Sequence, residues 1–99
     1  MYYQNTISTL LEAIEEKYPG LEKRFFSEID CTRKLPMDYI LWMLEEVQKM
    51  ETASLDGAVK AARWMGWIFR EIELDGIWTN TETRNHVRYD HLLGLDKPH

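Results

Sequence analysis

The sequence predicts an all-α protein, a compact bundle of about five helices that forms one domain over residues 1–99. Three observations favour this class. Apolar residues recur at helical spacing in successive segments, and residues that start or end helices stand between these segments. No segment shows the period-two alternation that a half-buried strand requires. An apolar content of 44% in 99 residues is enough for one hydrophobic core.

Two helices are predicted in the N-terminal third. The first covers about residues 5–18 and ends at Pro19-Gly20, and the second is short, running from Leu21 to near Cys31. Apolar residues at helical spacing support both: Ile7, Leu10, Leu11, Ile14 and Tyr18 in the first, and Leu21, Phe25, Phe26 and Ile29 in the second.

Two longer helices are predicted in the centre of the chain. One runs from Pro36 to about Glu51, because proline is favourable in a first helical turn. The other is capped by Ser54, runs to about Leu74 and stops before Asp75-Gly76. A helical wheel of the second gives a wide apolar stripe that we expect to face the core: Leu55, Ala58, Ala61, Ala62, Met65, Phe69 and Ile72.

The last predicted helix begins with a capping box, formed by Thr79 and Glu82, and is expected to fade by Gly94.

Within the preceding helix, Ala58, Ala62 and Gly66 follow one another every four residues, which lets another helix approach closely. That strip indicates either tight core packing or a dimer seam.

Self-association is expected through the two central helices, because each carries apolar or aromatic residues on more than one side. Trp67 lies opposite the apolar stripe of its helix, beside Arg63 and Arg70, where a cation–π contact alone contributes too little to explain a tryptophan. Tyr39 and Trp42 form a second patch off the main apolar face. The candidate interface residues are Tyr39, Trp42, Arg63, Trp64, Trp67 and Arg70.

A ligand site is expected near the C-terminal helix. Arg84, Arg88 and His91 form a basic stripe along one face, and guanidinium groups one turn apart converge on a single carboxylate or phosphate. Trp78 before the cap, with Trp67, would wall such a site. The competing interpretation is a structural brace from the arginines to acidic residues such as Glu73.

The sequence contains no motif for catalysis or for binding a metal or cofactor. His86 and Asp90 stand one helical turn apart, but two ligands do not define a metal site, and pairing between them is the simpler expectation. The single cysteine, Cys31, has no histidine near it in sequence, and paired glutamates point in different directions on a helix. We therefore expect no catalytic residue, no metal and no cofactor.

The charge and composition of the chain limit the kinds of partner that it is expected to bind. A formal net charge of −5 makes nucleic acid an unfavourable partner. The start of the chain lacks the features of a signal peptide and the longest apolar run is far too short to span a bilayer, so a cytoplasmic location with no membrane contact is expected. The partners expected are a second copy of the chain, a small anionic molecule or another protein.

Three function classes remain open. The leading one is a homo-oligomeric binding or interaction module with a small anionic ligand in a pocket between helices. The second is a DNA-binding regulator, in which the last two helices form a helix-turn-helix whose second helix offers Thr81, Thr83, Arg84, Asn85 and Arg88. A small enzyme is the third.

One resemblance concerns the last third of the chain. The run from Ala61 to Ile68 (AARWMGWI), followed by Asp75-Gly76-Ile77-Trp78-Thr79 and by Thr83-Arg84, resembles small all-helical bacterial proteins encoded on mobile integron gene cassettes. The resemblance implies a bacterial cytoplasmic protein that is often oligomeric. It implies no particular activity or ligand.

Overall fold

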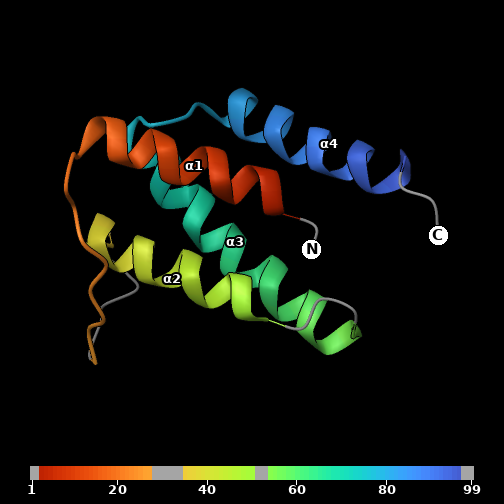
Figure 1. Ribbon diagram of the computed structural model, residues 1–99, viewed down its shortest axis with the longest axis horizontal. Helices are drawn as coiled ribbons and strands as arrows, with labels where there is room; N and C mark the ends of the chain where they lie inside the picture. The colour runs from red at the N-terminus through yellow and green to blue at the C-terminus, as the bar shows by residue number, and fades with distance from the viewer. Residues whose placement is uncertain (1–2, 28–34, 51–53, 97–99) are drawn as a thin grey trace.

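A computed structural model describes residues 3–27, 35–50 and 54–96, the last six of these by their backbone alone. Within these ranges the chain forms helices and no strands, which confirms the all-helical class. The helices are α1 (Gln4–Lys17), α2 (Met37–Lys49), α3 (Leu55–Asp75) and α4 (Asn80–Asp96), drawn in Figure 1.

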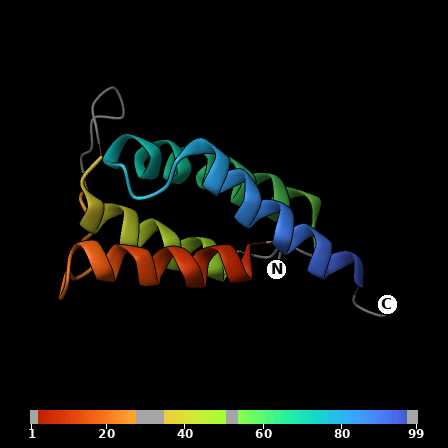
Figure 2. The same cartoon turned by 90° about the horizontal axis from the view of Figure 1, so that it is seen from above.

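The helices form a compact globule. α2 packs against both α3 and α1, and α4 lies beside α1 along one edge of the molecule (Figures 1 and 2). The buried core runs between the first three helices and includes Ile7, Leu10, Ile14, Ile40, Leu44, Val47, Met65, Ile68 and Ile72. The periodicity of the first helix therefore predicted its buried apolar residues Ile7, Leu10 and Ile14 correctly.

The ends of α3 follow local sequence signals. The Ser54 hydroxyl accepts a hydrogen bond from the Gly57 N–H at 3.1 Å, as an N-cap residue does. At the other end Gly76 adopts φ = 81°, a left-handed conformation that glycine reaches without a steric penalty. Its N–H then bonds to the Glu73 carbonyl, and the Ile77 N–H bonds to that of Ile72. Both predicted ends of this helix are confirmed.

The short helix predicted from Leu21 is wrong over residues 21–27, which form no helix. The chain there lies alongside α2 instead: the Arg24 N–H donates to the Asp38 carbonyl at 3.0 Å, and the Phe25 ring packs on Trp42 at 4.8 Å. A single short helix gains little stability from its own hydrogen bonds, so these tertiary contacts decide the conformation. Cys31, at the predicted end of this helix, lies outside the described residues.

The buried face of α3 is rotated from the predicted stripe. Leu55 is 80% exposed and Ala62 is exposed, whereas Ile68, which was outside the stripe, is fully buried. The rotation follows from the neighbour that α3 meets, because Trp64 contacts Trp42 of α2 and turns that flank inward. A wheel identifies apolar residues but not the helix that covers them.

The same rotation decides which glutamate of α3 is buried, and it exposes Gly66. Glu71 is fully buried, while Glu73, the acidic residue named for the structural brace, is exposed. The Glu71 Oε2 atom accepts the Leu35 N–H at 3.0 Å and so holds the backbone that enters α2. A Cβ built on Gly66 meets nothing within 4 Å. Core packing around Gly66 is therefore excluded within the described chain.

The C-terminal helix continues through Asp96, slightly beyond the predicted end at Gly94. In the part of the chain that the structure describes, no helix combines the length and the apolar character that crossing a bilayer requires.

Candidate functional site

The candidate site is built around the first turns of α4. Its capping box is formed as predicted: Thr79 Oγ1 accepts the Glu82 N–H, and Glu82 Oε1 accepts the Thr79 N–H, both at 3.1 Å. These two reciprocal hydrogen bonds fix the direction in which α4 starts. Arg84 and Arg88, one turn apart, then lie on the same face of the helix and are both exposed.

Asp90 fixes the position of α4 against α1. Its carboxylate accepts the N–H of Asn5 at 3.0 Å, the N–H of Thr6 at 2.7 Å and the Thr6 hydroxyl. Tyr3, the N-cap residue of α1, makes no side-chain capping bond, so Asp90 supplies the cap from the far end of the chain. The expected pairing of His86 with Asp90 is therefore replaced by this helix cap.

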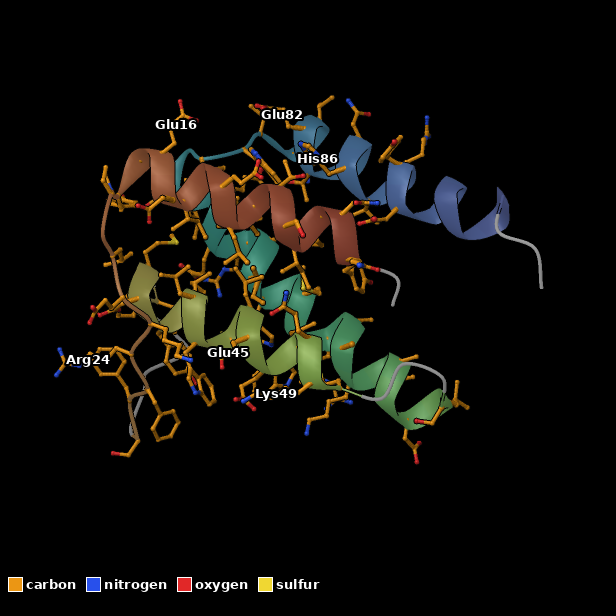
Figure 3. All side chains as sticks on the ribbon, viewed as in Figure 1. Glu16, Arg24, Glu45, Lys49, Glu82 and His86 are labelled. Carbon is orange, nitrogen blue, oxygen red and sulfur yellow. The ribbon has the colours of Figure 1, made fainter. Side chains whose placement is uncertain are left out.

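His86 has a different neighbour, the indole of Trp78. The two rings stack with centroids 4.1 Å apart and an interplanar angle of 14°, and Trp78 is only 6% exposed. Figure 3 shows His86 and Glu82 along the same edge of the molecule as Glu16 of α1. Trp78 belongs to the buried core, and it lines a cavity with Ala13 and Lys17 of α1 and not the one that Arg84 and Arg88 line.

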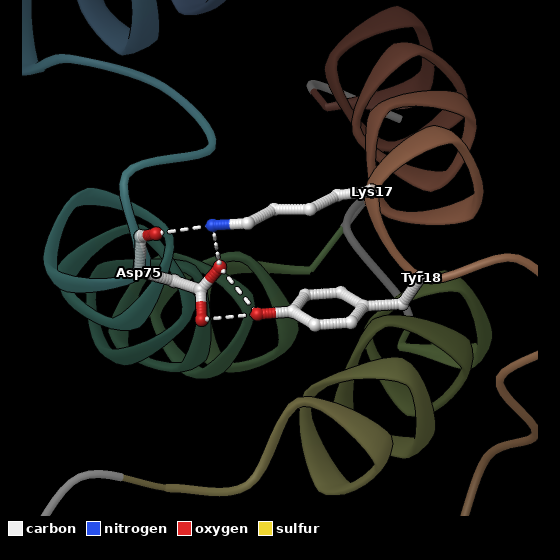
Figure 4. Close-up of polar contacts among 3 residues, drawn as sticks. All are labelled: Lys17, Tyr18 and Asp75. Carbon is white, nitrogen blue, oxygen red and sulfur yellow. Dashed lines mark hydrogen bonds and ion pairs between the residues drawn. The ribbon is translucent and has the colours of Figure 1, made fainter.

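A polar contact ties the ends of α1 and α3 together beneath this region (Figure 4). Lys17 Nζ donates to the Asp75 carbonyl at 2.6 Å and to its Oδ2 at 2.8 Å, and the Tyr18 hydroxyl donates to both carboxylate oxygens. The hydrogen bond to Asp75 raises the pKa of Lys17 above its usual value. The scaffold around α4 is thus held at both ends of α1.

A cavity of about 620 Å³ opens between α4, α3 and the residue that precedes α1. Tyr3 and Phe69 meet edge to face in its wall, with ring centroids 6.3 Å apart. Burial raises the pKa of the Tyr3 phenol, so this ring stays neutral at physiological pH. The lining residues are Tyr3, Phe69, Asn80, Thr83, Arg84, Val87 and Arg88.

The two arginines of this cavity form no ion pair with any carboxylate of the described residues. Glu73, the acidic partner considered for a structural brace, is exposed and belongs to none of these pairs. The brace to Glu73 is therefore wrong. Two uncompensated guanidinium groups remain beside an aromatic wall.

The other candidate ligand residues lie elsewhere. Trp67 lines a separate cavity of about 180 Å³ with Tyr39, Arg63 and Trp64, and Trp78 lines a third with Lys17. The His91 side chain is outside the part that the structure describes. Trp67 and Trp78 therefore do not wall the arginine site.

Sequence reasoning missed the apolar half of the arginine pocket. Phe69 belonged to the stripe expected to face the core, but it is half-buried and borders the cavity. Tyr3 and Val87 carried no recognisable signal, because each gains its role only through the docking of α4 on α1.

The candidate interface residues divide into two groups. Tyr39 stacks on Trp42 at 5.3 Å, and Trp42 meets Trp64 at 5.9 Å, so these three rings cover one another within the chain. Trp67 is 38% exposed, with the Arg70 guanidinium 5.7 Å from its ring centroid. The pairing of Trp67 with a cation on an exposed surface is as the sequence predicted. Arg63 is exposed as well.

The described residues offer little support for a metal site or a nucleic-acid interface. Among the described residues, no group of three or more His, Cys, Asp or Glu side chains lies close enough to hold a metal ion. Thr83, one of the predicted base readers, is only 7% exposed, and its hydroxyl donates to the Thr79 carbonyl. That residue is therefore unavailable to DNA.

Comparison of the chain with protein-family models, with curated proteins and with solved structures finds no match in any of the three.

Proposed function

We propose that this protein is a small binding module whose pocket between α3 and α4 takes an organic anion, a molecule with one carboxylate or phosphate and an apolar body. The observation that carries the proposal is the pair of unpaired arginines, Arg84 and Arg88, on the same cavity as Phe69, Val87 and Tyr3. Ligand pockets typically combine an apolar wall with a few polar groups that orient the ligand.

The chemistry of the lining supports an anion with an apolar body. Two guanidinium groups bind a carboxylate or phosphate through charge-assisted hydrogen bonds, which are stronger than neutral ones. Asn80, the first residue of α4, also lines the cavity, so the positive end of the helix dipole lies nearby. Phe69 and Val87 offer no polar group and fit a ring or a short acyl chain. A volume of about 620 Å³ is within the usual range for small ligands.

Thermal shift in the presence of phenyl phosphate, benzoate, hexanoate and inorganic phosphate tests the proposal. A ligand at ten times its Kd stabilises the folded state by about 1.4 kcal/mol, which raises Tm by roughly 6–11 °C for a domain of this size. We expect the organic anions to raise Tm more than inorganic phosphate does, because only they fill the apolar part.

The deciding variant is Arg84→Gln with Arg88→Gln. It should keep the Tm of the parent without ligand and lose the response to phenyl phosphate. Its control is Arg24→Gln with Lys49→Gln, which removes the same charge from the other side of the molecule (Figure 3) and should keep the response. No shift in the parent, or an equal shift in both variants, overturns the proposal.

Self-association is the second part of the proposed function. The module would act as a homodimer through apolar side chains that α3 exposes within the described part of the chain, among them Leu55, Val59 and Trp67.

A further inference from the structure

The positive charge of the arginine pocket exceeds what a single carboxylate neutralises. Arg84 and Arg88 bring two guanidinium groups to the cavity of about 620 Å³, and no other described residue that lines it is charged at neutral pH. Arginine stays protonated at any physiological pH, so neither charge is lost by titration. A ligand with one negative charge would leave one of the two guanidinium groups without a counterion.

The acidic side chains nearest to the two arginines in sequence are already engaged elsewhere. Glu82 Oε1 accepts the Thr79 N–H in the capping box, and the Asp90 carboxylate accepts the N–H groups of Asn5 and Thr6. Neither acidic residue lines the cavity, and neither forms an ion pair with an arginine. The positive charge of the pocket is therefore left for a ligand.

The neutral polar residues of the pocket add no charge of their own. Thr83 is only 7% exposed, and its hydroxyl already donates to the Thr79 carbonyl. Tyr3 keeps its proton, because burial raises the pKa of its phenol. Asn80 carries an uncharged amide. Recognition of an anion by charge thus depends on the two arginines.

The geometry of two guanidinium groups on one helix face favours a phosphate over a carboxylate. Side chains four residues apart start about 5–6 Å from each other, and each guanidinium presents a pair of N–H donors that fits two oxygens of one anion. A carboxylate has a single pair of oxygens. A phosphate monoester has three terminal oxygens, so Arg84 and Arg88 can each bind a different pair.

We propose that the ligand of the arginine pocket is a phosphate monoester in its dianionic form, bound by Arg84 and Arg88 with its organic group against the apolar wall. This assignment rests on the proposed function and narrows the ligand from organic anions in general to one chemical class. A phosphate monoester carries a charge of about −1.5 to −2 at pH 7, which matches two guanidinium groups. Inorganic phosphate lacks the organic group and leaves the wall uncovered.

Three ligands that share a phenyl group test the choice of headgroup by isothermal titration calorimetry at pH 8. Phenyl phosphate is a dianion there, because the second pKa of a phosphate monoester is about 6. Phenyl sulfate has nearly the same shape and three terminal oxygens but only one negative charge, and benzoate has one charge and two oxygens. We expect phenyl phosphate to have a Kd at least about tenfold below that of phenyl sulfate, and benzoate to bind most weakly.

Single substitutions test the part of each arginine. Arg84→Gln and Arg88→Gln should each weaken binding of phenyl phosphate about tenfold and that of phenyl sulfate less, so that the preference for the dianion shrinks. Both side chains are exposed and form no ion pair with the described residues, so Tm without ligand should stay unchanged. Arg24→Gln removes one positive charge from the other side of the molecule (Figure 3) and should keep both the affinity and the preference. An equal loss in this control would assign the preference to net charge and overturn the proposal.

The results for the headgroup and for the proposed function are separable. If the three phenyl ligands bind with equal affinity, the organic-anion pocket stands and the phosphate assignment is refuted. Tighter binding of benzoate than of phenyl phosphate has the same consequence, since the ligand would then be a carboxylate. If none of the three binds, the proposed function and the phosphate assignment are both refuted.

Discussion

Replacing Asp90 with alanine removes the carboxylate that caps α1 and docks α4 on it. The change abolishes bonds from the Asn5 N–H, the Thr6 N–H and the Thr6 hydroxyl. Loss of an N-cap costs about 0.5–2 kcal/mol, and a buried donor left unpaired costs about 1–3 kcal/mol. Thr6 is fully buried, so water cannot replace the lost acceptor. We expect the free energy of unfolding to fall by about 3 kcal/mol, or roughly 12–24 °C in Tm.

Urea denaturation followed by tryptophan fluorescence measures this loss. The slope of the unfolding free energy against urea should stay constant while the midpoint falls, and the Thr6 amide should exchange its hydrogen faster. Asp90→Asn keeps one acceptor oxygen and should lose about half as much. Asn85→Ala, at an exposed position on the same helix, is the control and should stay within about 0.5 kcal/mol of the parent. If Asp90→Ala is as stable as that control, the carboxylate does not cap α1.

Two further predictions concern single side chains. Thr79→Ala should lower the free energy of unfolding by about 1 kcal/mol, and Thr79→Ser should retain it; equal stability in urea would mean that the cap is not formed in solution. The hydrogen bond from Lys23 lowers the pKa of Glu45 below its usual value, so this carboxylate stabilises the fold above that usual pKa, and its contribution is lost as the pH falls through the lowered pKa. Glu45→Gln should therefore be less stable than the parent near neutral pH and equal to it in strong acid, with the exposed Glu12→Gln as control; a difference independent of pH would contradict the ion pair.

The helix boundaries that the sequence determined are those set by local chemistry. Ser54, Gly76 and the Thr79–Glu82 capping box each act through hydrogen bonds or backbone angles within a few residues, so their effect is the same in any surrounding. The arginine pair follows equally from position, because residues four apart on a helix share a face whatever packs around it.

The tertiary structure decided what no local pattern contains. Residues 21–27 form no helix because they contact α2 instead. The rotation of α3 buries Glu71 and exposes Ala62. Asp90 became the cap of a helix that begins more than eighty positions earlier in the chain. Each outcome depends on which segments, distant in sequence, pack against each other. The free energy that favours one packing arrangement over another comes from the whole chain and not from any single segment. The pocket has the same origin, since its arginines come from one helix and its aromatic wall from Tyr3 and α3.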